Sequence, residues 1–461
     1  MSEPVPTLLI LGASGDLTER LLLPGLGSLL AVETRRRVDV IGVDRDPMAR
    51  EDWQALVRRA FEGEDVPAET VDAVAGAAAY RQADLLDPAQ LDTVLEGLSG
   101  PLVIYFALPP QITVQVCALL EKRTLPEGTR LALEKPIGHD LASARALNAQ
   151  LVRVVPEEQV YRVDHFLGVN TVLNLIGVRF ANRLLQPIWS AEHIERVDIV
   201  YDEDLALEGR AGYYDKAGAL VDMIQSHLLQ ILALFAMESP ARLSAEEVHP
   251  LKAQALRATR LWGGSPEEAS RRARYTAGRI GEREVPDYVA EEGVDPGNDT
   301  ETLAELVLEV HNARWSGVPF VLRSGKALGR RCKTVLITFR PPPMVPEGMS
   351  DAPGPDQLEL ELRPGAVTLG LSMNAEGEPF QLEQKHLHAQ LGRPRMQPYG
   401  EILAGILDGD PLLAVRGEVA EQSWRIVEPV LAAWRAGSVP MQEYAAGSAG
   451  PDGWGEVPGW R

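Results

Sequence analysis

The chain has 461 residues, of which 45% are hydrophobic and 24% charged, a composition typical of a soluble globular protein with two or three domains. Its formal net charge of −21, from 45 basic and 66 acidic residues, opposes binding to nucleic acid or to an anionic membrane, so we expect neither partner. We expect a cytoplasmic protein without a metal, because no signal peptide, membrane-spanning run, disulfide framework or third ligand beside His386 and His388 is evident.

The first third of the chain alternates short apolar runs with helical stretches. The runs cover residues 7–12, 38–44, 101–110 and 129–136, and a helix interrupted by Pro24 is expected over 17–33. This alternation predicts a parallel, doubly wound sheet. We therefore expect an α/β, Rossmann-like coenzyme domain over residues 1–165.

The segment "GASGDL" (12–17) lies between the first predicted strand and the first predicted helix. Gly12 permits a tight turn, Gly15 permits close backbone approach, and the helix N-terminus offers N–H groups to a pyrophosphate. The alternative is a purely structural turn. The candidate coenzyme-binding residues of this loop are Gly12, Ser14, Gly15, Asp16 and Leu17.

The second predicted strand ends in "GVDRD", which places Asp44 beside Arg45. A carboxylate at this position normally binds the ribose hydroxyls of NAD, whereas an arginine normally holds the 2′-phosphate of NADP. The chain carries both, so either NADP or NAD is expected. An exposed loop pair without coenzyme contact is the alternative.

After about residue 165 the pattern changes to strands without regular crossover helices. They are predicted over residues 193–204, 305–315, 319–325, 334–343, 356–365 and 366–374, and 454–461 is expected to be a loosely ordered tail. This pattern favours a large, mainly antiparallel sheet. We assign residues 166–461 to a β+α domain for substrate binding and dimerisation.

Two segments carry titratable groups inside apolar surroundings. In "YRVDHFLGVN" (161–170), strand-like alternation would send Asp164 and His165 to opposite faces. A helix is predicted over 213–235, in which His227 follows Leu220 by seven residues and so shares its inward face. Such a histidine is usually a core residue, but an aspartate that oriented it would make it a general base. Spacing alone leaves open whether Asp164 and His227 meet.

Taken together, these segments resemble the glucose-6-phosphate dehydrogenase family, and the resemblance extends along nearly the whole chain. The resemblance rests on "GASGDL", "ALPP", "EKPIGHDL", "RVDHFLG", "RFAN", "EGRAGYYDKAGALVDMIQSHLLQ", "GVPFVLRSGK" and "SWRIVEP", in the family's order. It implies oxidation of C1 of glucose 6-phosphate to the 1,5-lactone, with hydride transfer to NADP or NAD. It also implies a homodimer or homotetramer.

The resemblance assigns roles to individual residues. His227 is the implied general base and Asp164 its orienting partner. Lys135 would contact both substrate and coenzyme, and His165 would bind the 6-phosphate. The remaining implied ligands are Glu203, Asp222 and Lys326 for the sugar hydroxyls and Ala107 and Pro109 for the coenzyme.

The chain departs from the family pattern where the phosphate should bind. Phe166 and Val169 replace the tyrosine and the lysine that are usual in the "DHYLGK"-type motif. Val221 replaces the arginine that the family carries before the helix aspartate, Asp222. Arg179 and Arg183 lie roughly 15 to 21 Å further along if a helix continues. The substrate is therefore glucose 6-phosphate with another cation, or free glucose or another uncharged aldose. A non-catalytic regulatory paralogue is disfavoured because the base and the Gly12–Gly15 loop are retained.

Overall fold

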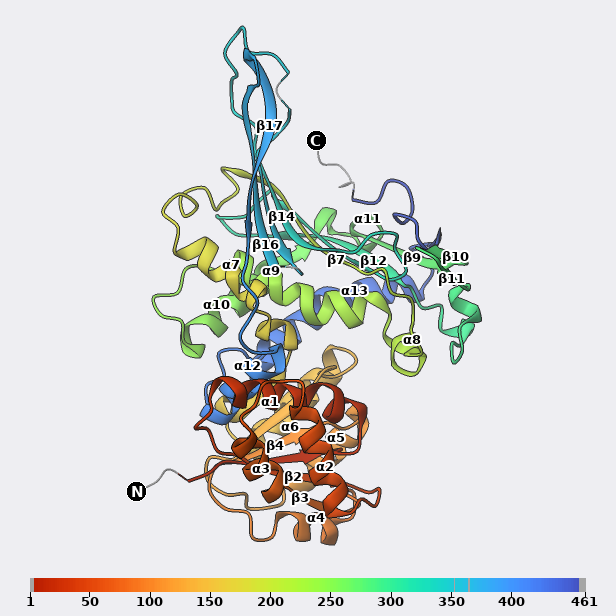
Figure 1. The fold of residues 1–461 in the computed structure, drawn as a ribbon. Coiled ribbons are helices and arrows are strands. Elements are labelled where there is room, and N and C mark those ends of the chain that lie inside the picture. Colours follow the sequence, from red (N-terminus) through yellow and green to blue (C-terminus); the bar gives the residue numbers. More distant parts are fainter. Residues whose placement is uncertain (1–3, 352, 364, 456–461) are drawn as a thin grey trace. The chain divides into compact units, whose positions relative to one another are not determined.

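The structure is a computed structural model that describes residues 4–351, 353–363 and 365–455 (Figure 1). The chain forms two compact units. The first contains the described residues up to Asn170, together with Pro240–Pro250 and Pro394–Glu421, and the second contains the other described residues. The expected loose tail lies outside the described residues from position 456 onward.

The first unit is built on a six-stranded sheet in which every neighbouring pair of strands is parallel. The strand order is β3 (Ala79–Gln82), β2 (Asp39–Asp44), β1 (Thr7–Leu11), β4 (Leu102–Phe106), β5 (Arg130–Glu134) and β6 (Val160–Val163). This is the doubly wound dinucleotide-binding order, with the crossover point between β1 and β4. The predicted α/β domain is confirmed.

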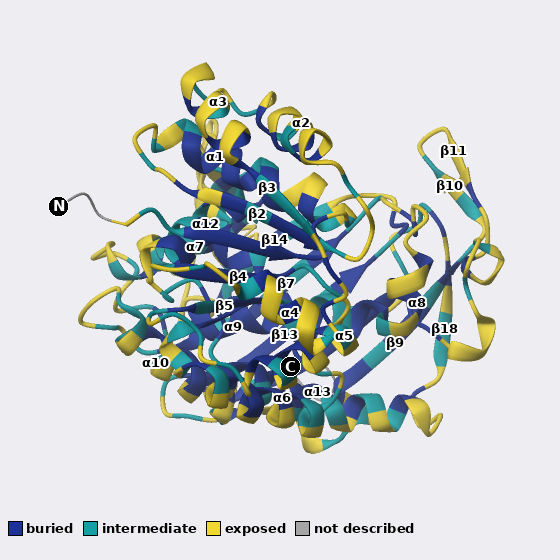
Figure 2. Ribbon diagram, turned by 90° about the horizontal axis from the view of Figure 1, so that it is seen from below, coloured by how far each residue is buried: buried dark blue, intermediate teal, exposed yellow. Residues whose placement is uncertain are grey.

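Helices connect these strands and cover the sheet. They are η1 (Thr18–Leu22), α1 (Leu23–Val32), α2 (Arg50–Phe61), α3 (Ala68–Ala77), α4 (Pro88–Leu95), α5 (Pro110–Leu120) and α6 (Leu141–Val154). In Figure 2, α2 and α3 turn exposed residues outward, while β4 is buried along its whole length. Pro24 does not end the first helix. The π-helical turn η1 runs directly into α1, and Pro24 stands at this junction, where the helix changes from π to α and continues.

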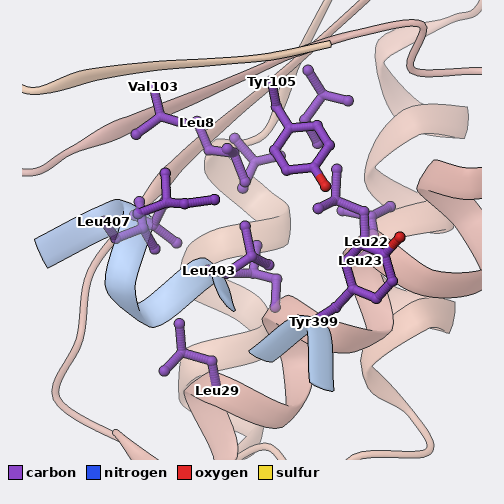
Figure 3. Close-up of a cluster of buried hydrophobic side chains, with 14 of the residues drawn as sticks. Leu8, Leu22, Leu23, Leu29, Val103, Tyr105, Tyr399, Leu403 and Leu407 are labelled. Carbon is purple, nitrogen blue, oxygen red and sulfur yellow. The ribbon is translucent and has the colours of Figure 1, made fainter. Parts of the chain in front are cut away.

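A helix from the C-terminal part of the chain completes the core of the first unit. Helix α12 (Pro398–Asp408) packs Tyr399, Leu403 and Leu407 among Leu8, Leu22 and other apolar side chains of β1, η1, α1 and β4 (Figure 3). Burial of such large apolar side chains stabilises the fold by about 1.5–3 kcal/mol each. A segment more than 230 residues beyond β6 therefore belongs to the first unit.

The second unit is built on a ten-stranded sheet that is mostly antiparallel. Its strands are β17 (Glu378–Gln390), β16 (Gly365–Ala375), β15 (Gln357–Leu362), β14 (Cys332–Phe339), β7 (Ile194–Asp202), β13 (Pro319–Gly325), β12 (Leu303–Val310), β9 (Ser270–Thr276) and β18 (Met441–Ala445), with β8 (Thr259–Leu261) also on β12. The pairs β7–β13 and β9–β18 are parallel. The predicted large sheet is confirmed.

The other elements are helices, short turns and one hairpin. They are η2 (Glu157–Gln159), η3 (His165–Gly168), α7 (Asn170–Phe180), α8 (Ala211–Ala219), η4 (Leu220–Leu228), α9 (Leu229–Ala236), α10 (Ala245–Ala258), η5 (Trp262–Gly264), α11 (Pro266–Ala269), β10 (Gly278–Ile280), β11 (Arg283–Val285), η6 (Tyr288–Ala290), η7 (Pro296–Asn298) and α13 (Gly417–Arg435).

The helix predicted over 213–235 is three consecutive segments. Helix α8 is interrupted at Gly218, whose φ of +66° and ψ of 176° are not helical, and the π-helix η4 and helix α9 follow. By length and composition the span Ala211–Ala236 could cross a membrane, which the sequence analysis did not anticipate. However, 78% of its most apolar window is buried inside the protein, as in a core helix.

Candidate active site

The loop after β1 is shaped by one close backbone approach. Gly12 has a φ of +90°, and a Cβ built on it would lie 2.3 Å from the carbonyl oxygen of Ala107. Only glycine tolerates both conditions. Ala107 itself is tied to the sheet, because its N–H donates to Leu11 O over 2.8 Å. The two predicted coenzyme segments, "GASGDL" and "ALPP", therefore meet at the crossover point of the first unit.

The end of β2 is bonded to the same loop. Asp44 Oδ2 accepts hydrogen bonds from Ser14 N at 3.1 Å and from Ser14 Oγ at 2.8 Å. The Arg45 side chain is 83% exposed and lies 3.8 Å from Asp46 Oδ1. Asp16 is exposed and pairs at 3.8 Å with Arg20, and Pro109 is also exposed. Asp44 thus braces the loop, while Arg45 extends into solvent.

Lys135 follows β5, and its peptide bond to Pro136 is cis. The preceding residue, Glu134, accepts hydrogen bonds from the hydroxyls of Tyr105 and Tyr399. Burial raises the pKa of Glu134 to about 7, although both tyrosines and Lys135 act to lower it. A half-buried lysine thus stands beside a half-buried carboxyl group of raised pKa at the carboxyl edge of the parallel sheet.

Asp164 and His165 lie just beyond β6, so the strand alternation expected for them does not apply. Strand β6 ends at Val163, and Asp164 caps the 3₁₀ turn η3 by accepting the N–H of Phe166 at 3.0 Å. Asp164 is 3% exposed. The half-buried His165 stacks on Tyr399, with ring centroids 5.9 Å apart and planes at 10°. Asp164 is therefore the capping residue of η3 and His165 is the first residue of that turn, and neither belongs to a strand.

In the second unit, the candidate sugar ligands collect at one edge of the large sheet. Strands β7 and β13 are parallel, so Glu203 and Lys326, which follow them, emerge at the same edge. Lys326 Nζ lies 3.1 Å from Glu203 Oε2, and Lys333 Nζ lies 3.0 Å from Glu203 Oε1. Burial acts to raise the pKa of Glu203, but the two ammonium groups outweigh it and the pKa is lowered. Glu203 is therefore held as a carboxylate acceptor.

His227 lies on the π-helix η4 and is 1% exposed. The start of η4 is capped by Glu301, whose Oε1 accepts the N–H of Leu220 at 2.9 Å. Gly218 makes room for this carboxylate, because a Cβ there would lie 2.3 Å from Glu301 Oε1. Burial raises the pKa of Glu301 to about 7, opposed by the bond from Leu220. The segment that carries His227 thus begins on a buried acid.

Asp222 lies one turn before His227 on η4. Desolvation of its hydroxyl raises the pKa of the Tyr213 phenol, although the residue as a whole is 40% exposed, and the hydrogen-bonded Asp222 carboxylate raises it further. The neighbouring Tyr214 ring lies 5.1 Å from Lys326 Nζ. Tyr213 and Tyr214 therefore connect two predicted sugar ligands, Asp222 and Lys326, within the second unit.

The arginines considered for the missing phosphate cation are not equivalent. Arg179 is buried on α7 and donates to Phe235 O at 2.9 Å, at the end of α9. Burial, and then the charge of Arg314, lowers the pKa of Arg179 to about 9. Arg183 follows α7 and is exposed. Arg179 therefore binds a carbonyl oxygen at the C-terminal end of α9. Val169 is half-buried, and its sequence neighbours, Gly168 and Asn170, are uncharged.

The structure adds residues that sequence reasoning missed. They are Glu134, Tyr105 and Tyr399 in the first unit and Lys333, Tyr213, Tyr214 and Glu301 in the second. Only Glu134, next to Lys135 in "EKP", had a local signal. The contact of Lys333 with Glu203 depends on strand pairing. The hydrogen bond from Leu220 N–H to Glu301 joins residues 81 positions apart in the chain. The first unit contains the predicted coenzyme-binding residues together with Asp164 and His165. The second unit contains His227 and the predicted sugar ligands Glu203, Asp222 and Lys326.

Comparison with known proteins covers almost the whole chain. The family model "Glucose-6-phosphate dehydrogenase, NAD binding domain" matches residues 9–174, and "Glucose-6-phosphate dehydrogenase, C-terminal domain" matches 176–457. The glucose-6-phosphate 1-dehydrogenase of Gluconobacter oxydans is 38% identical over 466 residues, 96% of this chain and 94% of that one. Glucose-6-phosphate 1-dehydrogenase 2 of Mycobacterium bovis is 40% identical over 384 residues, 79% of this chain and 74% of that one.

Solved structures agree. Glucose-6-phosphate 1-dehydrogenase from Mycobacterium avium superimposes with a TM-score of 0.85 at 33% identity, covering 98% of this chain and 96% of that one. A glucose-6-phosphate dehydrogenase in complex with its substrate glucose 6-phosphate gives a TM-score of 0.87 at 28% identity, with the same coverage. These matches define an NAD(P)-dependent oxidoreductase that acts on a CH–OH group. The chain belongs to the glucose-6-phosphate dehydrogenase family.

Proposed function

We propose that the protein oxidises C1 of glucose 6-phosphate to the 1,5-lactone, with NADP or NAD as hydride acceptor. The observation that carries this proposal is the family match over residues 9–174 and 176–457, together with 38% identity to a relative of nearly the same length. The retained His227, Asp164 and Lys135 support it against a non-catalytic paralogue. A cytoplasmic location and a homodimer or homotetramer belong to the same proposal.

The coenzyme site fits a dinucleotide. Gly12 leaves the backbone of the loop open beside Ala107, and Ser14 is fixed by Asp44. When bound, the nicotinamide coenzyme accepts the hydride that leaves C1. Asp44 already accepts hydrogen bonds from Ser14 N, Ser14 Oγ and Arg45 N, which leaves its Oδ1 one further acceptor position for a ribose hydroxyl. The exposed Arg45 is available to a 2′-phosphate, so both coenzymes have a recognition group.

The proton chemistry is assigned to His227 and Asp164. His227 takes the proton of the C1 hydroxyl, and Asp164 holds the imidazole and stabilises its cation. Glu203 accepts hydrogen bonds from sugar hydroxyls, and Lys326 donates to them. Both are pre-positioned by their mutual ion pair at 3.1 Å. Asp222 completes the proposed sugar ligands.

A second candidate function follows from the residues at the phosphate position. Phe166 is 5% exposed and Val169 offers no charge, so His165 is the one family phosphate ligand retained in this motif. A lost charged hydrogen bond costs about 1.5–3 kcal/mol, roughly tenfold to a hundredfold in affinity. Free glucose or another unphosphorylated aldose is therefore the alternative substrate.

We predict that Val169→Lys combined with Phe166→Tyr raises kcat/KM for glucose 6-phosphate by about tenfold or more, because one charged bond is restored. Free glucose should gain nothing, since it offers no anion to either group. Initial rates with both sugars measure the effect, and glucose controls for damage to the fold. A wild-type enzyme already strongly selective for the phosphate, with a neutral double variant, would show that another cation holds it.

A further inference from the structure

Two tyrosine hydroxyls converge on one carboxylate oxygen in the first unit. Tyr105 from β4 and Tyr399 from α12 both donate to Glu134 Oε1, Tyr399 over 3.1 Å. Figure 3 shows both rings in the apolar cluster, with Tyr105 on the sheet side and Tyr399 on the α12 side. Tyr105 is fully buried and Tyr399 is 6% exposed. Neither hydroxyl can find a replacement acceptor in water without exposing its ring.

The charged and titratable groups around Glu134 are Tyr105, Tyr399, Lys135 and Asp164. Burial raises the pKa of both tyrosines, and the nearby Glu134 raises it further, so the hydroxyls stay protonated and act as donors. Glu134 is thereby the common acceptor of the two buried tyrosine hydroxyls. Removing it would leave two buried donors unsatisfied, which is costlier than the loss of one exposed bond.

Tyr399 also contacts His165, the candidate phosphate ligand. Its ring stacks on His165 with centroids 5.9 Å apart and planes at 10°, and Phe166 contacts the same imidazole edge-on, with centroids 5.1 Å apart and planes at 69°. The Tyr399 ring is therefore one of the contacts that set the position of the imidazole. Its hydroxyl is bonded to Glu134, and its ring is packed in the apolar cluster.

We propose that Glu134 is a positioning residue that orients His165 for the far end of the sugar phosphate, acting through the Tyr399 hydroxyl and ring. The inference rests on the proposed function and deepens it, since no role for Glu134 follows from the general-base chemistry. Because the proposed partner of His165 is the phosphate and not the reacting C1–H bond, the effect should fall about equally on ground-state and transition-state binding. KM should therefore change much more than kcat.

The test compares two substitutions at Glu134. Glu134→Leu removes the acceptor, and we expect KM and the calorimetric Kd for glucose 6-phosphate to rise by about tenfold, while kcat falls by less than about threefold. Glu134→Gln keeps one acceptor oxygen and should recover most of the loss. Tyr399→Phe should raise KM by about threefold in the wild type and add nothing in the Glu134→Leu background.

Matched controls come from another tyrosine–carboxylate pair. Tyr275 OH donates to Glu291 Oε1 at 2.8 Å in the second unit. Tyr275→Phe and Glu291→Gln should lower thermal stability without moving KM. Circular dichroism and thermal unfolding establish that the Glu134 variants are folded, and Tyr399→Phe, which keeps the ring, tests the same path with less disturbance.

The outcomes separate the two claims. If wild type binds and oxidises glucose 6-phosphate while Glu134→Leu keeps its affinity, the positioning role is wrong and the proposed function stands. If Glu134→Gln is as damaging as Glu134→Leu, the acceptor role is also wrong. If wild type neither binds nor oxidises the sugar phosphate, the proposed function and the inference built on it both fail.

Discussion

At the scale of single residues, His227 is the proposed general base. We predict that His227→Ala lowers kcat by about a hundredfold to ten-thousandfold, because it removes the proton acceptor. Coenzyme affinity should stay unchanged, since His227 belongs to the second unit and the coenzyme loop to the first. His249→Ala is the control, as it removes another buried histidine, which bonds Leu412 O. Near-wild-type kcat in His227→Ala would refute the assignment.

Gly12 provides a test of the coenzyme site that leaves the sugar ligands untouched. We predict that Gly12→Ala raises the Kd of NAD(P) by about tenfold or more, because a positive φ alone costs a side chain about 1–2 kcal/mol and its Cβ would lie 2.3 Å from Ala107 O. Gly76→Ala, in α3 with open space around its Cβ, should leave Kd unchanged. Equal Kd values for wild type and Gly12→Ala by fluorescence titration would contradict this reading of the loop.

Sequence reasoning at this scale depended on whether the signal was local. Gly12 and Gly15 were identified from the turn chemistry of a strand-to-helix junction, which needs no knowledge of distant residues. The alternation argument for Asp164 and His165 was wrong, since β6 ends at Val163 and Asp164 serves as a cap. A capping residue one position beyond a short strand looks, in sequence, like one more strand residue.

At the scale of elements, the helix that carries His227 depends on a buried acid. The folded-state pKa of Glu301 is about 7 against an ordinary value of 4.5, so the native state binds its proton more tightly than the unfolded state. Its stabilising contribution is full below pH 4.5 and is lost as the pH rises through 7. At roughly 1.4 kcal/mol per unit of pKa, that loss is about 3 kcal/mol.

We therefore predict that Glu301→Gln removes part of the fall in the free energy of unfolding between pH 4.5 and pH 7.5. The amide oxygen can still accept the Leu220 N–H, so the cap survives while the titration disappears. Denaturant unfolding at the two pH values measures the difference. Glu134 titrates over the same range in both proteins and therefore cancels in the comparison. Identical pH dependence in wild type and variant would show that Glu301 does not titrate there.

The helical period correctly indicated an inward-facing segment, because Leu220 and His227 are both buried. It did not indicate the break at Gly218 or the π-helix. Those features follow from Glu301, which lies 81 residues away from Leu220 in the chain. A period records which face is apolar, whereas the cap that starts a segment comes from its tertiary neighbours.

At the scale of the whole molecule, the two sheets were predictable in class and the membership of α12 was not. The βα alternation before residue 165 and the strand-rich remainder each follow from local patterns. The packing of α12 on the first unit, and the approach of Lys333 to Glu203, depend on which strands and helices become neighbours. A boundary at residue 165 remains a prediction, and the discontinuous first unit identifies 394–421 as a segment to retain when that domain is isolated.

The most direct test of the central claim is the initial rate of NAD(P)H formation by the purified full chain with glucose 6-phosphate and with glucose, each with NADP and with NAD. The account predicts coenzyme reduction with glucose 6-phosphate, and 1,5-lactone as the product. A higher kcat/KM for glucose would transfer the assignment to the unphosphorylated aldose. A protein that binds the coenzyme but reduces neither NADP nor NAD with either sugar would contradict the account and indicate a non-catalytic member of the family.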